Sequence, residues 1–182
     1  MKINFLTILR DSFTERTYQK LSEQISISSE QAKNGVHVII PLILASILEN
    51  NTASNAIQPI WWNSLKEEYA YKDDKTININ IINKTFLALK GRGLSWHLFR
   101  FCYNDIATLI SEKASIRKNN AVSLIEITTL LVAGYLIKWL EWEGWKFEDL
   151  IDNLLNAKYE IIGSLPAGIS PVHLGITAKF FG

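Results

Sequence analysis

The hydrophobic pattern of the chain is helical almost throughout, and two stretches, residues 36–48 and 122–137, are apolar on every side. A helix that is apolar all round belongs in the centre of a bundle or in a membrane. Both stretches fall short of the roughly 20 apolar residues that a membrane span needs, and Glu126 inside the second would be costly in lipid. The pattern therefore predicts two buried core helices.

The pattern predicts shorter helices on either side of these stretches and two long helices that contain them. In the first half we expect helices up to residue 9, from about residue 14, over residues 29–49 and over residues 57–71; in the second half over residues 78–89, 96–113, 118–142, 147–159 and 172–181. Thr14 should cap one of them, and Ser28 with Gln31 has the form of a capping box. Pro41 should kink or break the first long helix near residues 38–40, because it removes a backbone hydrogen bond. The whole chain is predicted to be all-α.

The two halves also resemble each other. At an offset of 88 residues, the segment 21–48 matches the segment 109–136, with identical residues at Leu21/Leu109, Ile39/Ile127, Leu42/Leu130, Ala45/Ala133 and Leu48/Leu136. A repeated unit of this kind usually cannot bury its apolar face alone, so two copies should pack together. We therefore expect one domain over residues 1–182, a multihelical bundle of two related halves with one long apolar helix in each. The first half covers about residues 1–71, the linker about 72–76 and the second half about 77–182.

Several packing and turn motifs carry a family resemblance. They are the apolar run 121–137, Gly144, the helix containing Leu150 and Leu154, the turn Leu165-Pro-Ala-Gly168 and the pair Leu174-Gly175. Together they resemble the bacterial YidB-like family of unknown function, and the step Ile40-Pro41-Leu42 in the first half is similar to the same family. The resemblance implies a helical fold of this type. For relatives that continue into a peptidoglycan-binding domain, it also implies an association with the cell envelope.

The chain departs from the family pattern at Thr128-Thr129, where a proline is usual. This departure predicts that the second long helix is straighter than the first. The apolar run at the N-terminus is too short, and too soon interrupted by charge, for a signal peptide, so we expect the protein in the cytoplasm.

Composition and charge exclude several kinds of partner. The net charge of +1 gives no global field to attract nucleic acid or acidic lipid. Lys113, Arg117 and Lys118 form a small basic patch without interleaved aromatic residues, so no nucleic-acid partner is predicted. Cys102 stands alone and rules out an intramolecular disulfide. It is expected to be a small buried hydrophobe.

Catalytic and metal-binding patterns are not found in the sequence. His37, His97 and His173 are scattered, and none has a second ligand at i+3 or i+4. The run Lys90-Gly91-Arg92-Gly93 lacks the spacing of a phosphate loop and is interpreted as a helix stop and turn, after which Ser95 caps the next helix. The carboxylates over residues 141–152 are interpreted as a solvated surface. We predict no catalytic residue, no metal and no cofactor, and expect a protein that is not an enzyme.

Tryptophan supplies the strongest functional indication. Trp139 and Trp142 share a helix face and Trp145 follows in the turn, while Trp61 and Trp62 must point in different directions. These side chains could fill the core, anchor the protein at a membrane interface or form a docking surface, because tryptophan removes a large apolar area from water and keeps one donor.

From these residues we expect an interaction or scaffold module that docks another protein, in an envelope or secretion-related assembly by family resemblance. The predicted partner-binding residues are Trp61, Trp62, Trp139, Trp142 and Trp145, with the acidic segment 141–152 at their rim. Two alternatives stay open: a membrane-associating or pore-modulating protein that uses the two long apolar helices, and an enzyme of unrecognised type. Self-association is also open.

Overall fold

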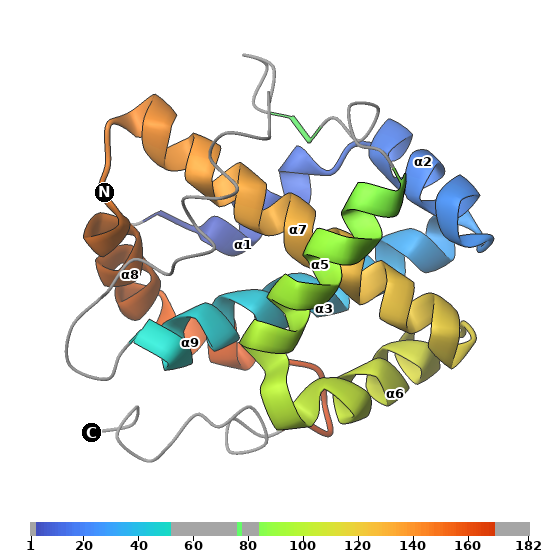
Figure 1. Ribbon diagram of the computed structural model, residues 1–182. Helices are drawn as coiled ribbons and strands as arrows, with labels where there is room; N and C mark the ends of the chain where they lie inside the picture. The colour runs from blue at the N-terminus through green and yellow to red at the C-terminus, as the bar shows by residue number, and fades with distance from the viewer. Residues whose placement is uncertain (1–2, 52–75, 78–83, 170–182) are drawn as a thin grey trace.

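A computed structural model describes residues 3–51, 76–77 and 84–169, and over these residues the chain is all-α (Figure 1). The helices are α1 (Phe5–Ser12), α2 (Glu15–Ile25), α3 (Ser29–Asn51), α5 (Lys84–Phe99), the short 3-10 helix η2 (Arg100–Cys102), α6 (Tyr103–Lys113), α7 (Lys118–Glu143), α8 (Phe147–Asn156) and α9 (Lys158–Gly163). The helices predicted over residues 57–71 and 172–181, and most of the linker 72–76, lie outside the described residues.

The two long helices α3 and α7 form the centre of the fold. Every residue of α3 from Ile39 to Leu48 and of α7 from Leu124 to Ile137 is buried, which confirms the two predicted core helices. Each fully buried Leu or Ile side chain contributes roughly 1.5–3 kcal/mol of transfer free energy. The remaining helices are wrapped around this pair, and Figure 1 shows α5 crossing α7 at the middle of the molecule. One hydrophobic core therefore joins residues of both halves.

Length and composition would allow α3 and α7 to cross a membrane. However, 72% of the most apolar window of α3 and 83% of that of α7 are buried inside the fold. The core helices of soluble proteins have the same length and composition, so this property alone does not distinguish the two environments.

Pro41 lies inside α3 and does not interrupt it. The helix is continuous from Ser29 to Asn51, so it does not break at the proline, and the alternative of a kink stays a prediction. A proline in a helix interior costs about 3 kcal/mol. Here neighbouring helices bury Pro41 and the residues on both sides of it, and this all-round packing offsets the cost.

The turns that lead into the two long helices have the same geometry. Ser26 before α3 and Ser115 before α7 both adopt the left-handed conformation, with φ of 58° and 53°. In each turn the amide of the following isoleucine, Ile27 or Ile116, donates to a serine carbonyl five residues earlier. This bond satisfies a carbonyl that the end of the short helix leaves free.

The two turns lie 89 residues apart, one residue more than the offset of 88 at which the two segments match in sequence. At an offset of 88 the buried Leu21 pairs with the half-buried Leu109, whereas at 89 it pairs with the buried Ile110. The kinship of the two units stays a prediction.

A glutamine connects the two turns. Ser28 and Gln31 form the predicted capping box, in which the Ser28 amide donates to the Gln31 side chain and the Gln31 amide donates to the Ser28 hydroxyl. The side-chain amide of Gln31 also donates to the carbonyl of Ser115 at 2.7 Å. The starts of α3 and α7 are therefore held side by side.

Helix α5 continues through Gly91 and Gly93, so the predicted helix stop at this run is wrong. Gly91 is buried against the backbone carbonyl of Glu126 in α7, where an added Cβ would clash. Gly91 therefore permits α5 and α7 to approach closely, and it does not end α5. Ser95 is likewise not a cap, because its hydroxyl donates to the Arg92 carbonyl inside α5.

The C-terminal part of the described chain follows the prediction more closely. Gly144, with φ of 67°, ends α7 as expected, and the Trp145 amide donates back to the carbonyl of Leu140. The single helix predicted over residues 147–159 is divided, since α8 ends at Asn156 and α9 begins at Lys158.

Candidate functional site

Only part of the predicted tryptophan surface belongs to the described residues. Trp61 and Trp62 lie outside the described residues. Trp139, Trp142 and Trp145 are half-buried and pack against the core. The structure brings the first two together around Tyr135, with ring centroids 6.4 and 5.9 Å away, and Trp139 also meets Phe5 edge-on at 6.4 Å. These rings therefore contribute to packing, and their partner-binding role stays a prediction.

Other aromatic residues are the exposed ones. Among the described residues, the large hydrophobic side chains most open to solvent are Phe101 at 98%, Tyr159 at 68% and Trp96 at 52%. Sequence reasoning did not single them out, because helical periodicity does not show which aromatic side chain the tertiary fold leaves uncovered. Trp96 and Phe101 both lie at the bend between α5 and α6.

The bend directs neighbouring aromatic residues in opposite directions. Helix α5 ends at Phe99, which is buried, and η2 begins with Arg100, which has a φ of 45°. A left-handed conformation is uncommon for a residue with a β-carbon and marks a locally constrained backbone. Phe101, directly after it, points into solvent. We call Trp96, His97, Arg100 and Phe101, all exposed, the bend patch.

A buried polar group supports the bend patch from beneath. The Trp96 ring stacks on Tyr103 with centroids 5.5 Å apart and planes 10° apart. The Tyr103 hydroxyl donates to the Glu126 carboxylate at 3.3 Å, and the Arg92 Nε atom lies 3.6 Å from the same carboxylate oxygen. Trp96 is therefore connected through Tyr103 to the central helix α7.

Burial is the largest influence on the pKa values of Glu126 and Tyr103. It raises the pKa of Glu126, while the hydrogen bond from Tyr103 and the charge of Arg92 act in the opposite direction. Burial, reinforced by the Glu126 charge, raises the pKa of Tyr103 to about 12. Tyr103 thus keeps its proton and acts as a donor at neutral pH.

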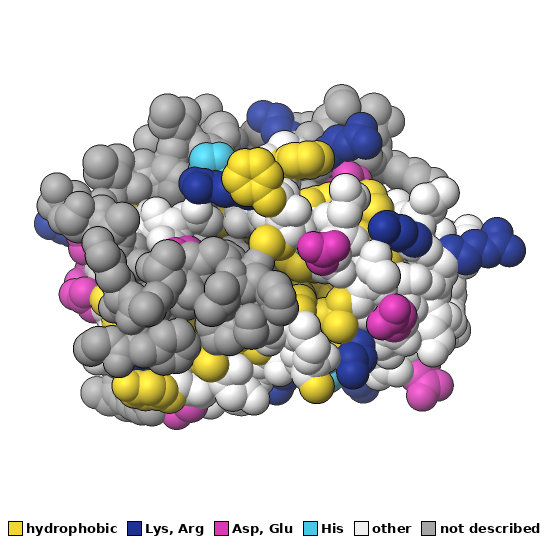
Figure 2. Space-filling model, turned by 90° about the horizontal axis from the view of Figure 1, so that it is seen from below, with side chains coloured by type: hydrophobic (Ala, Val, Ile, Leu, Met, Phe, Trp, Pro, Cys, Tyr) yellow, Lys and Arg dark blue, Asp and Glu magenta, His cyan; other side chains and the backbone are white. Residues whose placement is uncertain are grey.

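A groove runs beside the bend patch, between α6 and residues 167–169. Its volume is about 460 Å³, and its lining includes the apolar side chains of Ile106, Leu109 and Ile169 and the carboxylates of Asp105 and Glu112. In Figure 2, apolar side chains lie in a hollow, acidic side chains lie beside the hollow and large apolar side chains project at its edge. We call this feature the α6 groove.

Cys102 also lines the α6 groove and packs against the core, but it is half-buried rather than buried as expected. It lies at the end of η2, where the chain leaves the core to form the bend. Burial, followed by the negative charge of Asp105, raises the pKa of its thiol. A raised pKa favours the protonated thiol, which is a weak nucleophile.

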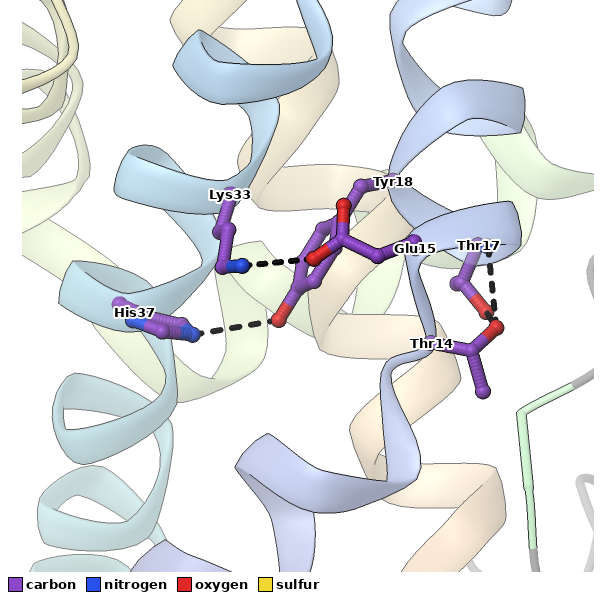
Figure 3. Close-up of polar contacts among 6 residues, drawn as sticks. All are labelled: Thr14, Glu15, Thr17, Tyr18, Lys33 and His37. Atoms are coloured by element: carbon purple, nitrogen blue, oxygen red, sulfur yellow. Dashed lines mark hydrogen bonds and ion pairs between the residues drawn. The ribbon is translucent and has the colours of Figure 1, made fainter.

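A second polar group joins α2 to α3 (Figure 3). The Tyr18 hydroxyl lies 3.2 Å from Nε2 of His37, and the Lys33 ammonium forms a 2.6 Å ion pair with Glu15. Lys33 also lies 5.6 Å from the centre of the Tyr18 ring. Burial, with smaller contributions from the charges of Arg10 and Lys33, lowers the pKa of His37. A largely neutral, hydrogen-bonded histidine of this kind holds two helices together.

The other residues considered for chemistry are dispersed. His97 is exposed on α5, and His173 lies outside the described residues. Lys113, Arg117 and Lys118 are exposed around the start of α7, and the carboxylates of residues 141–152 are exposed on α7 and α8. Within the described part of the chain, no group of three His, Cys, Asp or Glu side chains could hold a metal ion.

Comparison with protein-family models, with curated proteins and with solved structures found no match to this chain.

Proposed function

We propose that this protein is a non-enzymatic helical interaction module and that it binds another protein through the bend patch. The observation that carries the proposal is the near-complete exposure of Phe101 beside the half-exposed Trp96. Leaving a phenylalanine side chain in water forgoes roughly 1.5–3 kcal/mol that its burial would supply. A partner that covered the ring would recover this free energy.

The way in which the patch is held supports the same role. Trp96 stacks on Tyr103, which is hydrogen-bonded to the buried Glu126. A ring already held in one orientation loses little conformational entropy when a partner binds. Tryptophan and arginine are also enriched among the side chains that dominate binding energy at interfaces, and Trp96 and Arg100 belong to the patch.

We further propose that such a module serves an envelope or secretion-related process. The resemblance of the LPAG turn and the apolar helices to YidB-like proteins supports an assembly connected with the bacterial envelope or with secretion. The half-buried group Trp139, Trp142 and Trp145 is retained as a second docking face, with the exposed carboxylates beside it.

Site-specific photocrosslinking in the native host tests the proposal. A photoreactive phenylalanine analogue at position 101 should give a discrete protein adduct, because the side chain there is fully available to a partner. The same analogue in place of Gln19, an exposed residue of α2, is the matched control and should give none. Equal adducts at both positions, or no adduct at position 101, would contradict the assignment of this surface.

A membrane-associating role is the second candidate, because α3 and α7 are long and apolar enough to span a bilayer. It requires these helices to exchange their protein neighbours for lipid. Flotation with liposomes distinguishes the two roles: an interaction module of the proposed kind stays in the soluble fraction, and a membrane-associating protein floats with the vesicles.

A further inference from the structure

The bend patch and the α6 groove are adjacent in sequence and in space, yet Phe101 does not occupy the groove. The next residue, Cys102, lines the groove, whereas the Phe101 ring is 98% exposed. One molecule thus carries a projecting aromatic side chain and, beside it, an apolar-lined recess that this side chain does not fill.

We propose that the α6 groove binds a second copy of this chain, with Phe101 of each copy inserted into the groove of the other. This inference rests on the proposed function, since it identifies the partner of the bend patch. In a two-fold dimer the same patch is used on both subunits, so a projection and a recess that lie side by side are both occupied at once. The resulting assembly is closed and does not grow into a filament.

The groove has the size and lining to take the ring. A cavity of roughly 150 Å³ holds a benzene molecule. The groove, at about 460 Å³, therefore accommodates a phenyl ring together with part of the chain that bears it. Leu109 and Ile169, which are both half-buried, supply apolar contacts for the ring.

The charges on the two features are complementary. Arg100, which is exposed, directly precedes the projecting Phe101. The groove carries two carboxylates, Asp105 and Glu112, against one cation, Lys113. When Phe101 enters the groove of a second copy, it brings the Arg100 guanidinium to this acidic rim. Charge complementarity of this kind fixes the orientation of partners, and it favours a second copy over a partner with an acidic or purely apolar surface.

Sedimentation equilibrium of the full chain tests the dimer. The wild-type protein should be dimeric, and Phe101→Ser should weaken the dimer by about 30-fold or more, the loss expected for an interface hot spot. Tyr159→Ser is the matched control, because Tyr159 is also an exposed aromatic residue but belongs neither to the bend patch nor to the residues that line the groove. It should leave the dimer unchanged. Equal weakening by both variants would overturn the proposed interface.

Charge reversal gives a second test, in which dimer formation should be lost in each variant and restored in their mixture. Arg100→Glu and the double variant Asp105→Lys/Glu112→Lys should each be monomeric, because each places like charges together. Mixed in equal amounts, they should form a heterodimer, since both of its contacts again join opposite charges. Circular dichroism of each variant verifies that the helices are retained. Two folded variants that stay monomeric in the mixture would overturn the proposal.

The dimer and the interaction module can be overturned separately. A monomeric wild-type chain that still crosslinks to a different protein from position 101 would overturn the dimer and leave the interaction module standing. A monomeric chain that gives no adduct at all would overturn both.

Discussion

His37 of α3 and Glu126 of α7 occupy equivalent places in the two long helices, each eleven residues after a serine in the left-handed conformation. Each is a polar residue on a mainly apolar helix, and each is hydrogen-bonded to a tyrosine of the short helix before it. The Tyr18 hydroxyl lies 3.2 Å from His37, and the Tyr103 hydroxyl donates to Glu126 at 3.3 Å. One residue is a base and the other an acid, so their effects on stability have opposite pH dependence.

Replacing His37 by glutamine should remove a loss of stability at low pH. Burial lowers the pKa of His37 below its ordinary 6.5 in the folded protein, so folding favours the neutral ring. The stability that this group contributes is present above pH 6.5 and is lost as the pH falls through the lowered value. His37→Gln keeps a polar side chain near Tyr18 but does not titrate. Urea unfolding at pH 8, 6.5 and 5 should show a smaller decrease toward acid for the variant than for the wild type.

Tyr18→Phe is the control for this prediction. It removes the hydroxyl and should cost about 1 kcal/mol, the net value of a typical hydrogen bond. Because burial is the largest cause of the shifted pKa, the dependence on pH should persist in this variant. A Tyr18→Phe protein that lost the pH dependence would assign the effect to the hydrogen bond.

Replacing Glu126 by glutamine should have the opposite pH signature. Burial raises the pKa of Glu126 above its ordinary 4.5, so folding favours the protonated acid. The stability that this group contributes is fully present below pH 4.5 and is lost as the pH rises through the raised value. Glu126→Gln stays neutral and can still accept from Tyr103. The variant should therefore gain stability relative to the wild type as the pH rises from 4 to 8, measured by urea unfolding. A constant difference across this range would contradict the prediction.

The core helices were predictable from sequence because a helix that is apolar all round has one stable place in a bundle. The correspondence of the two turns was not predictable in this way. The identities that support an offset of 88 are leucine, isoleucine and alanine, which coincide easily between two apolar helices. The structural correspondence depends on serines in the turns, Ser26 with Ser115 at an offset of 89, and their left-handed conformation is a property of the folded backbone.

The candidate site was less predictable than the fold. The predicted tryptophans of α7 meet aromatic neighbours, whereas the exposed ring of Phe101 lies at a bend that no proline or glycine marks. The sequence pattern Phe99-Arg100-Phe101 does not show that one phenylalanine faces the core and the other faces solvent. That difference follows from the backbone of Arg100.

Alanine substitution at the two glycines of α5 should change the stability of the protein in opposite directions. At Gly93 an added Cβ meets nothing, so Gly93→Ala should stabilise the protein by about 0.5–1 kcal/mol, the ordinary gain in a helix. At Gly91 the Cβ would clash with the backbone carbonyl of Glu126, and two helices would have to move apart. Overpacking typically costs 1–3 kcal/mol, so Gly91→Ala should destabilise the protein by about 2 kcal/mol. Thermal unfolding of both variants measures the difference, and equal shifts would contradict the close packing of α5 on α7.

Gly35 of α3 and Leu124 of α7 should be energetically coupled, because a Cβ on Gly35 would clash with a terminal methyl group of Leu124. Gly35→Ala should destabilise the wild-type protein by about 1–2 kcal/mol, since both positions are buried where the central helices meet. Leu124→Ala alone should cost about 2–5 kcal/mol, as expected for a cavity in a core. In that background the added methyl group enters vacated space, and Gly35→Ala should become neutral or stabilising.

The double-mutant cycle from urea unfolding should therefore give a coupling of about 1–3 kcal/mol between Gly35 and Leu124. Gly93→Ala in the same Leu124→Ala background is the control, because no neighbour lies near an added Cβ at position 93. Its effect should be additive. If Gly35→Ala were additive as well, the two long helices would not meet at this pair, and the close packing of α3 on α7 described above would be incorrect.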